Sequence, residues 1–452
     1  MKHHLLVLGM YCALGVSTPV LASSVESLAD TKISHSLSLE QIIQIALEQD
    51  GTKAQLTAQT EATLEAGLAK ATLMDPTIKL GVGGLPTDSF RLDQDPMTNL
   101  SVGLMQKFDR GNTTELQSKM AGSQANISSS QIAFREREII TQVTQLWLEL
   151  GYARTAEKLL HKQHKWLSQL VDNMQANYSL GLNESQDIIA SQLKVSQLEQ
   201  KIIASQQQQQ ALTAQLSEWL GYQWLNQSAD LNASNQLAWQ KLTASLSQAS
   251  KPQVLQQRLL NHPMVLNVDA SIEVAKTQVE IADQAYSPQF GVEVMYAHRQ
   301  ANNMKGEPAP DMVSAFITMD LPIFTDNKQD RAYAAAQHQV GAAKSMRDAT
   351  LARLSAQLQS LMSQREHTLT RLARYKTTLV PQSKAQQQAV ERGYQNNSAT
   401  FSDIVTSSIN QLSIELEQQR LITDLNLINN QLSGLLGLFD HSYPLTQQRE
   451  NQ

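Results

Sequence analysis

The sequence predicts a mainly helical fold in which duplicated long coiled-coil helices accompany four β-strands of the membrane type. Three observations predict it. Landmark residues recur at a constant spacing, two long stretches lack proline, and four short runs alternate apolar residues with small or polar ones. Since helices and strands recur together in each half, we expect two similar structural repeats within one chain.

The two halves share landmarks that lie 216 positions apart: Asp187 and Asp403, Tyr178 and Tyr394, Leu220-Gly221 and Leu436-Gly437. A repeat of this length far exceeds the roughly 20 to 50 residues of a solenoid unit. We therefore predict a first repeat over residues 23–221 and a second over residues 252–437. Residues 222–251 would form a linker or equatorial segment, and residues 438–452 a polar tail.

The N-terminus has the pattern of a secretory signal peptide. Lys2 precedes an apolar stretch from Leu5 to Val16, and Val20-Leu21-Ala22 offers small residues for cleavage. Removal of residues 1–22 would also remove Cys12, the only cysteine, which excludes disulfide and thiol chemistry. The residues before Cys12 do not fit a lipoprotein signal, so we expect no lipid anchor.

Composition narrows the class of protein further. Only 41% of the 452 residues are hydrophobic and 5% are aromatic, which is lean for large compact cores. No stretch after the signal peptide reaches 18 consecutive apolar residues, so any membrane crossing is expected to use β-strands. The mature chain would carry 35 basic and 42 acidic residues, and this net negative charge argues against a nucleic-acid partner.

Long helices are expected where proline is absent, at residues 97–251 and 323–380. A heptad seam runs along the first of these stretches, with Glu157 and His164 at two of its positions. Its apolar members are Ile139, Val143, Leu146, Leu150, Ala153, Leu160, Leu167, Val171 and Met174. A continuous helix from Thr113 to Tyr178 would measure roughly 100 Å, and a similar seam follows Ile414.

Two hairpins with period-two alternation lie between the helices, at about residues 77–107 and 289–323. In each run one face is apolar and the other is small or polar, apart from Phe316, which breaks the rule. The runs have about the 9 to 11 residues that a tilted strand needs to cross a bilayer. Alternation alone fits a soluble hairpin covered by helices equally well.

Closure of the sheet separates these alternatives. Four strands cannot close a barrel, and an open sheet edge in lipid leaves backbone groups unpaired. Two chains would give eight strands with a filled interior, whereas three would give twelve strands and an open tube. If the purpose is a tube, a homotrimer is therefore the smallest solution.

The arrangement resembles the TolC-like outer-membrane efflux channels over essentially the whole mature chain. The resemblance is carried by Asp75-Pro76 and Ser287-Pro288, by residues 320–324 with the sequence DLPIF, and by the turn at residues 178–182 followed by Asp187. It implies a homotrimer with a twelve-stranded barrel among outer-membrane lipids and a helical tunnel across the periplasm. It also implies docking onto a periplasmic adaptor and an inner-membrane pump.

The resemblance further implies which residues work at the periplasmic tips. Tip or adaptor contacts would be Tyr178, Leu180, Gly181, Leu182, Tyr394, Asn396, Asn397 and Ser398. Asp187 and Asp403 would form the periplasmic gate, where three copies of each make a carboxylate ring that attracts cations. The alternative is that each aspartate only caps its helix beside Ser185 or Ser402.

Two stretches of the sequence bear on the cargo. Residues 83–86 and 103–111 resemble the heavy-metal branch of the family, which works with RND-type cation pumps. A drug-efflux or type I secretion channel is the alternative within the family, and a soluble periplasmic coiled-coil scaffold or adaptor is the alternative outside it. The histidines show no ligand spacing, and the methionines around the second hairpin are interpreted as packing residues in preference to a metal relay. No enzyme motif occurs, so we expect no catalysis, cofactor or bound metal.

Overall fold

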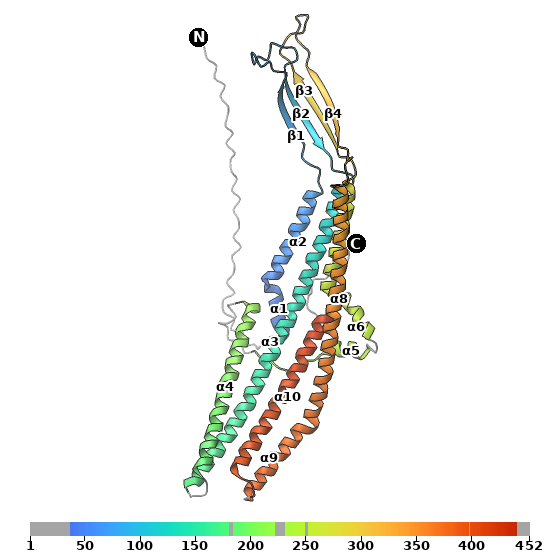
Figure 1. The fold of residues 1–452 in the computed structure, drawn as a ribbon. Coiled ribbons are helices and arrows are strands. Elements are labelled where there is room, and N and C mark those ends of the chain that lie inside the picture. The colour runs from blue at the N-terminus through green and yellow to red at the C-terminus, as the bar shows by residue number, and fades with distance from the viewer. Residues whose placement is uncertain (1–36, 180–183, 222–230, 249–251, 397, 441–452) are drawn as a thin grey trace, which may run out of the picture.

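The computed structural model describes residues 37–179, 184–221, 231–248, 252–396 and 398–440, which form an elongated bundle of helices with a β-sheet at one end (Figure 1). The expected signal peptide lies outside these residues, as do parts of the equatorial segment and most of the polar tail. The helices extend from the sheet to two hairpin tips at the opposite end of the molecule (Figure 1).

Helices of the two halves follow the same order. The first half contains α1 (Leu39–Gln49), α2 (Gly51–Lys70), α3 (Thr113–Ser179) and α4 (Ser185–Leu220). After α5 (Gln240–Gln248), the second half contains α6 (Pro252–Leu259), α7 (Pro263–Gln284), α8 (Gln329–Arg374), α9 (Val380–Gln395) and α10 (Phe401–Leu436). The long helix expected from Thr113 is thus a single α-helix of 67 residues.

A helix break at the same place in each half is capped by a different residue. Asp50 ends α1 and caps α2 by accepting a hydrogen bond from the Lys53 N–H at 2.6 Å. His262 caps α7 by accepting one from the Met264 N–H at 3.2 Å, with Pro263 at the first helical position. Both caps satisfy backbone donors that a helix start leaves free.

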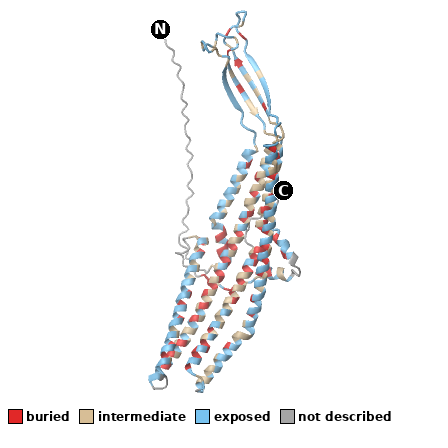
Figure 2. Cartoon of the chain, in the orientation of Figure 1, coloured by how far each residue is buried: buried red, intermediate tan, exposed pale blue. Residues whose placement is uncertain are grey.

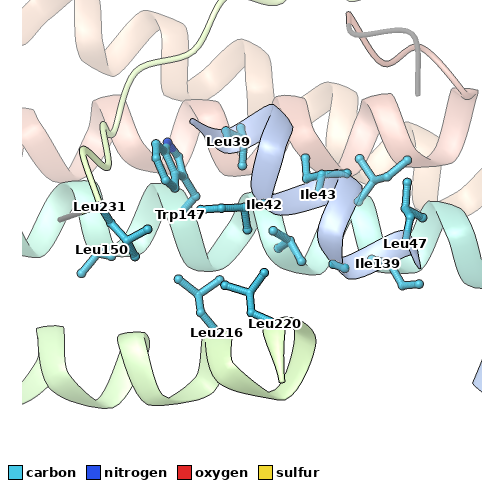
Figure 3. Packing of buried hydrophobic residues seen from close by; sticks show 13 residues of the cluster. Leu39, Ile42, Ile43, Leu47, Ile139, Trp147, Leu150, Leu216, Leu220 and Leu231 are labelled. Atoms are coloured by element: carbon cyan, nitrogen blue, oxygen red, sulfur yellow. The ribbon is translucent and has the colours of Figure 1, made fainter. Parts of the chain in front are cut away.

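The main core lies at mid-height, where α1 packs against α3 and the end of α4 (Figure 3). Ile42, Ile139, Leu150 and Leu216 are each fully buried there. Towards both ends of the molecule the helices are mostly exposed on their outer faces (Figure 2). Burial is therefore concentrated in seams between helices, in accordance with the lean composition.

The heptad seam of α3 is confirmed, because all its apolar members except Leu146 are buried and Leu146 packs against the core. The two polar positions in the seam are also satisfied. Glu157 accepts hydrogen bonds from Gln206 at 2.9 Å and from Gln209 at 2.6 Å, and His164 lies 3.1 Å from Glu199. Gln206 and Gln209 therefore link α4 to α3.

Pro381 lies inside the helical stretch that leads from β4 to the second predicted tip. A π-helical turn at Tyr375–Leu379 joins α8 to α9, and in it the Val380 N–H bonds to the Tyr375 carbonyl five residues back. Proline has no N–H, and its ring clashes with the carbonyl four residues earlier in an α-helix. The wider turn just before Pro381 removes that clash, so the chain bends and continues as α9 (Figure 1).

Both hairpins join into one antiparallel sheet of β1 (Thr77–Gly83), β2 (Asn99–Lys107), β3 (Phe290–His298) and β4 (Met312–Met319), in this spatial order. Strand β2 of the first half pairs directly with β3 of the second half. The sheet projects beyond the ends of the helices instead of packing under them (Figure 1). A hairpin covered by helices is therefore excluded.

Replacing Gly151 by alanine should detach the segment after Leu231 from α3. A Cβ at Gly151 would lie 2.2 Å from the Ser234 carbonyl carbon and 2.4 Å from the Asn235 nitrogen. We expect a loss of about 1–3 kcal/mol, measured as a lower apparent melting temperature. Gly122→Ala on the same helix has open space around its Cβ and should be neutral or stabilising; equal destabilisation by both would contradict the packing described.

Acid should weaken the fold through His262. Burial, with Arg137 and Arg353 nearby, lowers the pKa of His262 from 6.5 to about 4. The unfolded chain therefore binds this proton first, and stability is lost as pH falls from about 6.5 towards 4, by at most about 3 kcal/mol. Melting temperatures at pH 7.5 and 4.5 should differ less in His262→Asn, which can still cap α7, than in the wild type or in a His161→Asn control.

Candidate functional site

The sheet gathers apolar side chains of all four strands onto one face. Directly paired residues of an antiparallel sheet point to the same side. The register of this sheet pairs apolar residues with apolar residues. One row contains Ile78, Leu104, Val294 and Ala315, and another contains Leu80, Val102, Tyr296 and Val313. Leu80 is 81% exposed and Ile317 is 79% exposed, so this apolar face has no cover within the described chain.

The opposite face of the sheet is small and polar. Lys79, Gly103, Met295 and Ser314 form one of its rows, and Lys79 pairs with Glu293 at 2.6 Å across three strands. Phe316 lies on this face, as its position in the alternation predicts. The sheet is therefore two-sided, with an exposed apolar surface on one side and a charged surface on the other.

Arg110, which lies between β2 and the start of α3, links the sheet to the helices. Its guanidinium donates to the Ser287 carbonyl at 2.8 Å and pairs with Asp320 directly after β4. Asp320 in turn accepts a hydrogen bond from the Gln289 N–H at 2.6 Å. This polar cluster joins residues of both halves at the place where strands become helices.

Both hairpin tips are brought together at the far end of the molecule (Figure 1). A buried apolar cluster joins α3, α4 and α10 there, with Leu167, Met174, Ile188 and Phe401 among its members. Tyr394 of α9 packs edge-to-face on Phe401 with ring centroids 6.2 Å apart. Tyr178, by contrast, is half exposed near the end of α3, so the two equivalent tyrosines have different surroundings.

Several predicted tip residues lie outside the described chain: Leu180, Gly181, Leu182 and Asn397. Asn396 ends α9, and Ser398 is exposed. The Gly393 carbonyl accepts hydrogen bonds from the Ser398 N–H at 2.7 Å and from the Ala399 N–H at 3.2 Å. The chain therefore does reverse direction at the second predicted tip.

Asp187 and Asp403 differ in what their carboxylates contact. Asp403 forms a capping box with Thr400: its carboxylate accepts from the Thr400 N–H at 2.9 Å and from the Thr400 hydroxyl at 2.7 Å. These bonds lower the pKa of Asp403. Asp187 lies in the first turn of α4 and is partly exposed, and its carboxylate has no hydrogen bond to any other described residue. Asp403 thus caps its helix, through Thr400 and not Ser402.

The sequence patterns did not identify the contacts that hold α9 to α10. The Tyr375 hydroxyl donates to the Glu417 carboxylate beside the π-helical turn, and Lys384 lies 3.7 Å from Glu415. These residues come from helices that are remote in sequence, so no local motif marks them. A search for i to i+4 charge pairs would not find them either.

Neither a membrane-spanning helix nor a metal-binding cluster is found among the described residues. None of the described helices combines the length and the hydropathy that a membrane span requires. Nor does any group of three His, Cys, Asp or Glu side chains come together there in a way that could hold a metal ion.

Substitution of the two aspartates by alanine should separate their structural roles. Asp403→Ala removes half of the capping box, so amides in the first turn of α10 should exchange with solvent faster. Asp187→Ala should leave exchange in the first turn of α4 nearly unchanged, because its carboxylate holds no described donor. Hydrogen exchange with mass spectrometry measures both; identical responses would contradict the difference in geometry.

Comparison with known proteins agrees with the architecture. Residues 254–438 match the family model described as outer membrane efflux protein. No individual curated protein sequence matches the chain. The match thus covers most of the second half, including β3, β4 and the helices that follow.

Several solved membrane proteins align with most of the chain. A membrane protein from Pseudomonas aeruginosa aligns with TM-score 0.73 and 14% identity over 93% of each chain. The channel-forming protein CusC aligns with TM-score 0.72 and 12% identity over 88% of this chain and 91% of its own. The open-state MtrE outer membrane channel of Neisseria gonorrhoeae aligns with TM-score 0.68 and 13% identity over 88% of each chain.

At such low sequence identity, the solved structures show only that the fold is similar, whereas the family model shows similarity of sequence. Residues 254–438 match the outer membrane efflux protein family, and the described chain has the fold of solved outer-membrane channels such as MtrE.

Proposed function

We propose that this protein is the outer-membrane channel of a tripartite efflux system, a passive trimeric conduit from the periplasm to the exterior. The observation that carries the proposal is the exposed sheet. Strands β1 and β4 have free edges in the single chain, and one face of the sheet is apolar and uncovered. Closure of three sheets into a twelve-stranded barrel would pair these edges with each other. The apolar face would then lie in lipid, and the polar face would line a pore.

The helices supply a tube of the length that the function requires. At about 1.5 Å per residue, the 67 residues of α3 extend roughly 100 Å. All the long helices extend from the same end of the sheet (Figure 1). Three copies side by side would continue the barrel wall across the periplasm, to the level of an adaptor protein and an RND-type pump in the inner membrane. An N-terminal signal peptide would direct the chain there without a lipid anchor.

Metal cations are the cargo we propose, because residues 83–86 and 103–111 resemble the heavy-metal branch of the channels. Carboxylates near the tips suit cationic traffic. Under threefold symmetry Asp187 and Asp403 would each supply three carboxylates, and such rings concentrate cations and bind divalent ions that block the pore. Tyr178, Tyr394, Asn396 and Ser398, with Leu180, Gly181, Leu182 and Asn397, would form the surface that meets the adaptor.

Membrane extraction tests the channel against a soluble periplasmic scaffold, the main alternative. A barrel protein should stay in the outer-membrane fraction through alkaline carbonate washing and leave only with detergent. Release by carbonate alone would contradict the proposal. The OmpA-type barrel of the same membranes serves as the retained control, since closed barrels leave no unpaired edge in lipid.

Single-channel recording tests the gate. Asp187→Ala and Asp403→Ala together should raise the open probability in planar bilayers and weaken block by divalent cations by at least about tenfold, since each ring loses its charge. Asp424→Ala, on α10 but far from the tip, is the matched control. Unchanged opening and unchanged block in the double variant would remove the gate assignment while leaving the channel assignment intact.

A further inference from the structure

Three methionines lie on the small, polar face of the sheet, one on each of three neighbouring strands. Met105 on β2 is paired with Glu293, and Met295 lies two residues further along β3. Met295 is paired with Ser314, and Met312 lies two residues away on β4. Paired residues, and residues two apart along a strand, point to the same side of a sheet. Met105, Met295 and Met312 therefore form a diagonal row on one face, which we call the methionine ladder.

The methionine ladder leads away from the helices. Strand β3 follows α7 and extends towards the far end of the sheet (Figure 1). Each methionine therefore lies one strand across and one row further from the helices than the methionine before it. Diagonal neighbours in a sheet are roughly 7–8 Å apart, a separation that long side chains can span. Because methionine is unbranched and flexible, two adjacent members of the ladder can contact one ion.

The side chains of the ladder are accessible on this face. Met312 is 45% exposed, and Met105 and Met295 are partly exposed. No described helix packs on the sheet, which projects beyond the helices (Figure 1), so the ladder is not part of a helical core. The residues paired directly with the ladder are small or hydrophilic: Thr77, Gly103, Glu293, Ala297 and Ser314.

The chemistry of this face favours soft cations. Thioether sulfur is a neutral, soft ligand that selects ions such as Cu(I), whereas Mg²⁺ and Ca²⁺ prefer carboxylate, carbonyl and water oxygens. Glu293 is the only carboxylate among the residues paired with the ladder, and its charge is offset by Lys79 at 2.6 Å. The attraction of this face for hard divalent cations is correspondingly weak.

We propose that the methionine ladder conducts soft monovalent cations, Cu(I) or Ag(I), along the wall of the pore. The inference rests on the proposed channel, since closure of three sheets would turn this face towards the lumen, and it narrows the cargo from metal cations to soft ones. Conduction requires sites that bind well enough for entry and weakly enough for exit. A row of neutral thioethers, each shared between neighbouring positions, meets that requirement.

Silver block of the potassium current in planar bilayers tests the ladder on the full-length protein. A nitrate electrolyte keeps Ag⁺ in solution. Replacing Met105, Met295 and Met312 together by leucine keeps the side-chain volume and removes the sulfur. We expect the Ag⁺ concentration for half-block to rise at least about tenfold, the equivalent of about 1.4 kcal/mol, whereas the K⁺ conductance and the block by Mg²⁺ should stay unchanged. Met319→Leu is the matched control, because Met319 is paired with Phe290 on the apolar face of the same sheet.

The outcomes separate the ladder from the channel. Silver block that is unchanged in the triple variant, or weakened equally by Met319→Leu, would overturn the ladder and leave the channel intact. Should the triple variant form no channels, Met312→Leu alone changes the most exposed member of the ladder; weaker silver block would support the proposal, and unchanged block would overturn it. A wild-type protein that forms no channel would overturn the proposed function, and the ladder with it.

Discussion

The structure depends on one constraint, the hydrogen-bonding need of a four-stranded sheet that stands clear of its own helices. Every strand in the middle of the sheet is paired, but β1 and β4 each have one free edge. In water such edges attract other chains, and in lipid they are too costly to remain open. The exposed apolar face adds a second demand, for a nonpolar environment. The proposed trimeric closure in a bilayer would satisfy both demands at once and would align the helices into a tube.

The two halves of the chain have the same order of helices and strands, so each would contribute a similar segment to the wall of the proposed tube. Their structures nevertheless differ at three places. The helix break is capped by Asp50 in one half and by His262 in the other. The first long helix is uninterrupted, whereas its counterpart bends at the π-helical turn before Pro381. At the tips, Asp403 is held in a capping box while Asp187 has a free carboxylate among the described residues. The two halves therefore differ at the helix break, in the long helix and at the tips.

Sequence patterns predicted the long helices, the apolar seam and the four strands because each depends on local periodicity. The register of the sheet also follows from that periodicity, since a shift by one residue would turn the apolar side chains to the wrong face. Other features depend on residues that meet only in the folded chain. No local signal marks the ion pair of Arg110 with Asp320 or the hydrogen bond of Tyr375 to Glu417. None marks the buried Asn430 Oδ1, which accepts no hydrogen bond from the described residues. The π-helical turn before Pro381, which lets the helix continue through this proline, also has no local periodic signal.

Cross-linking of the free sheet edges tests the central claim most directly. Cysteines at Lys79 on β1 and Ser314 on β4 lie in the same row of one sheet, roughly 14 Å apart at about 4.8 Å per strand. A bifunctional thiol reagent shorter than that separation can bridge the two cysteines only between chains. Cys12, the single native cysteine, lies within the expected signal peptide and would not compete for the reagent. The account predicts a covalent trimer on a denaturing gel from outer membranes. Exclusively monomeric or dimeric products, from membranes in which both cysteines react fully, would contradict it.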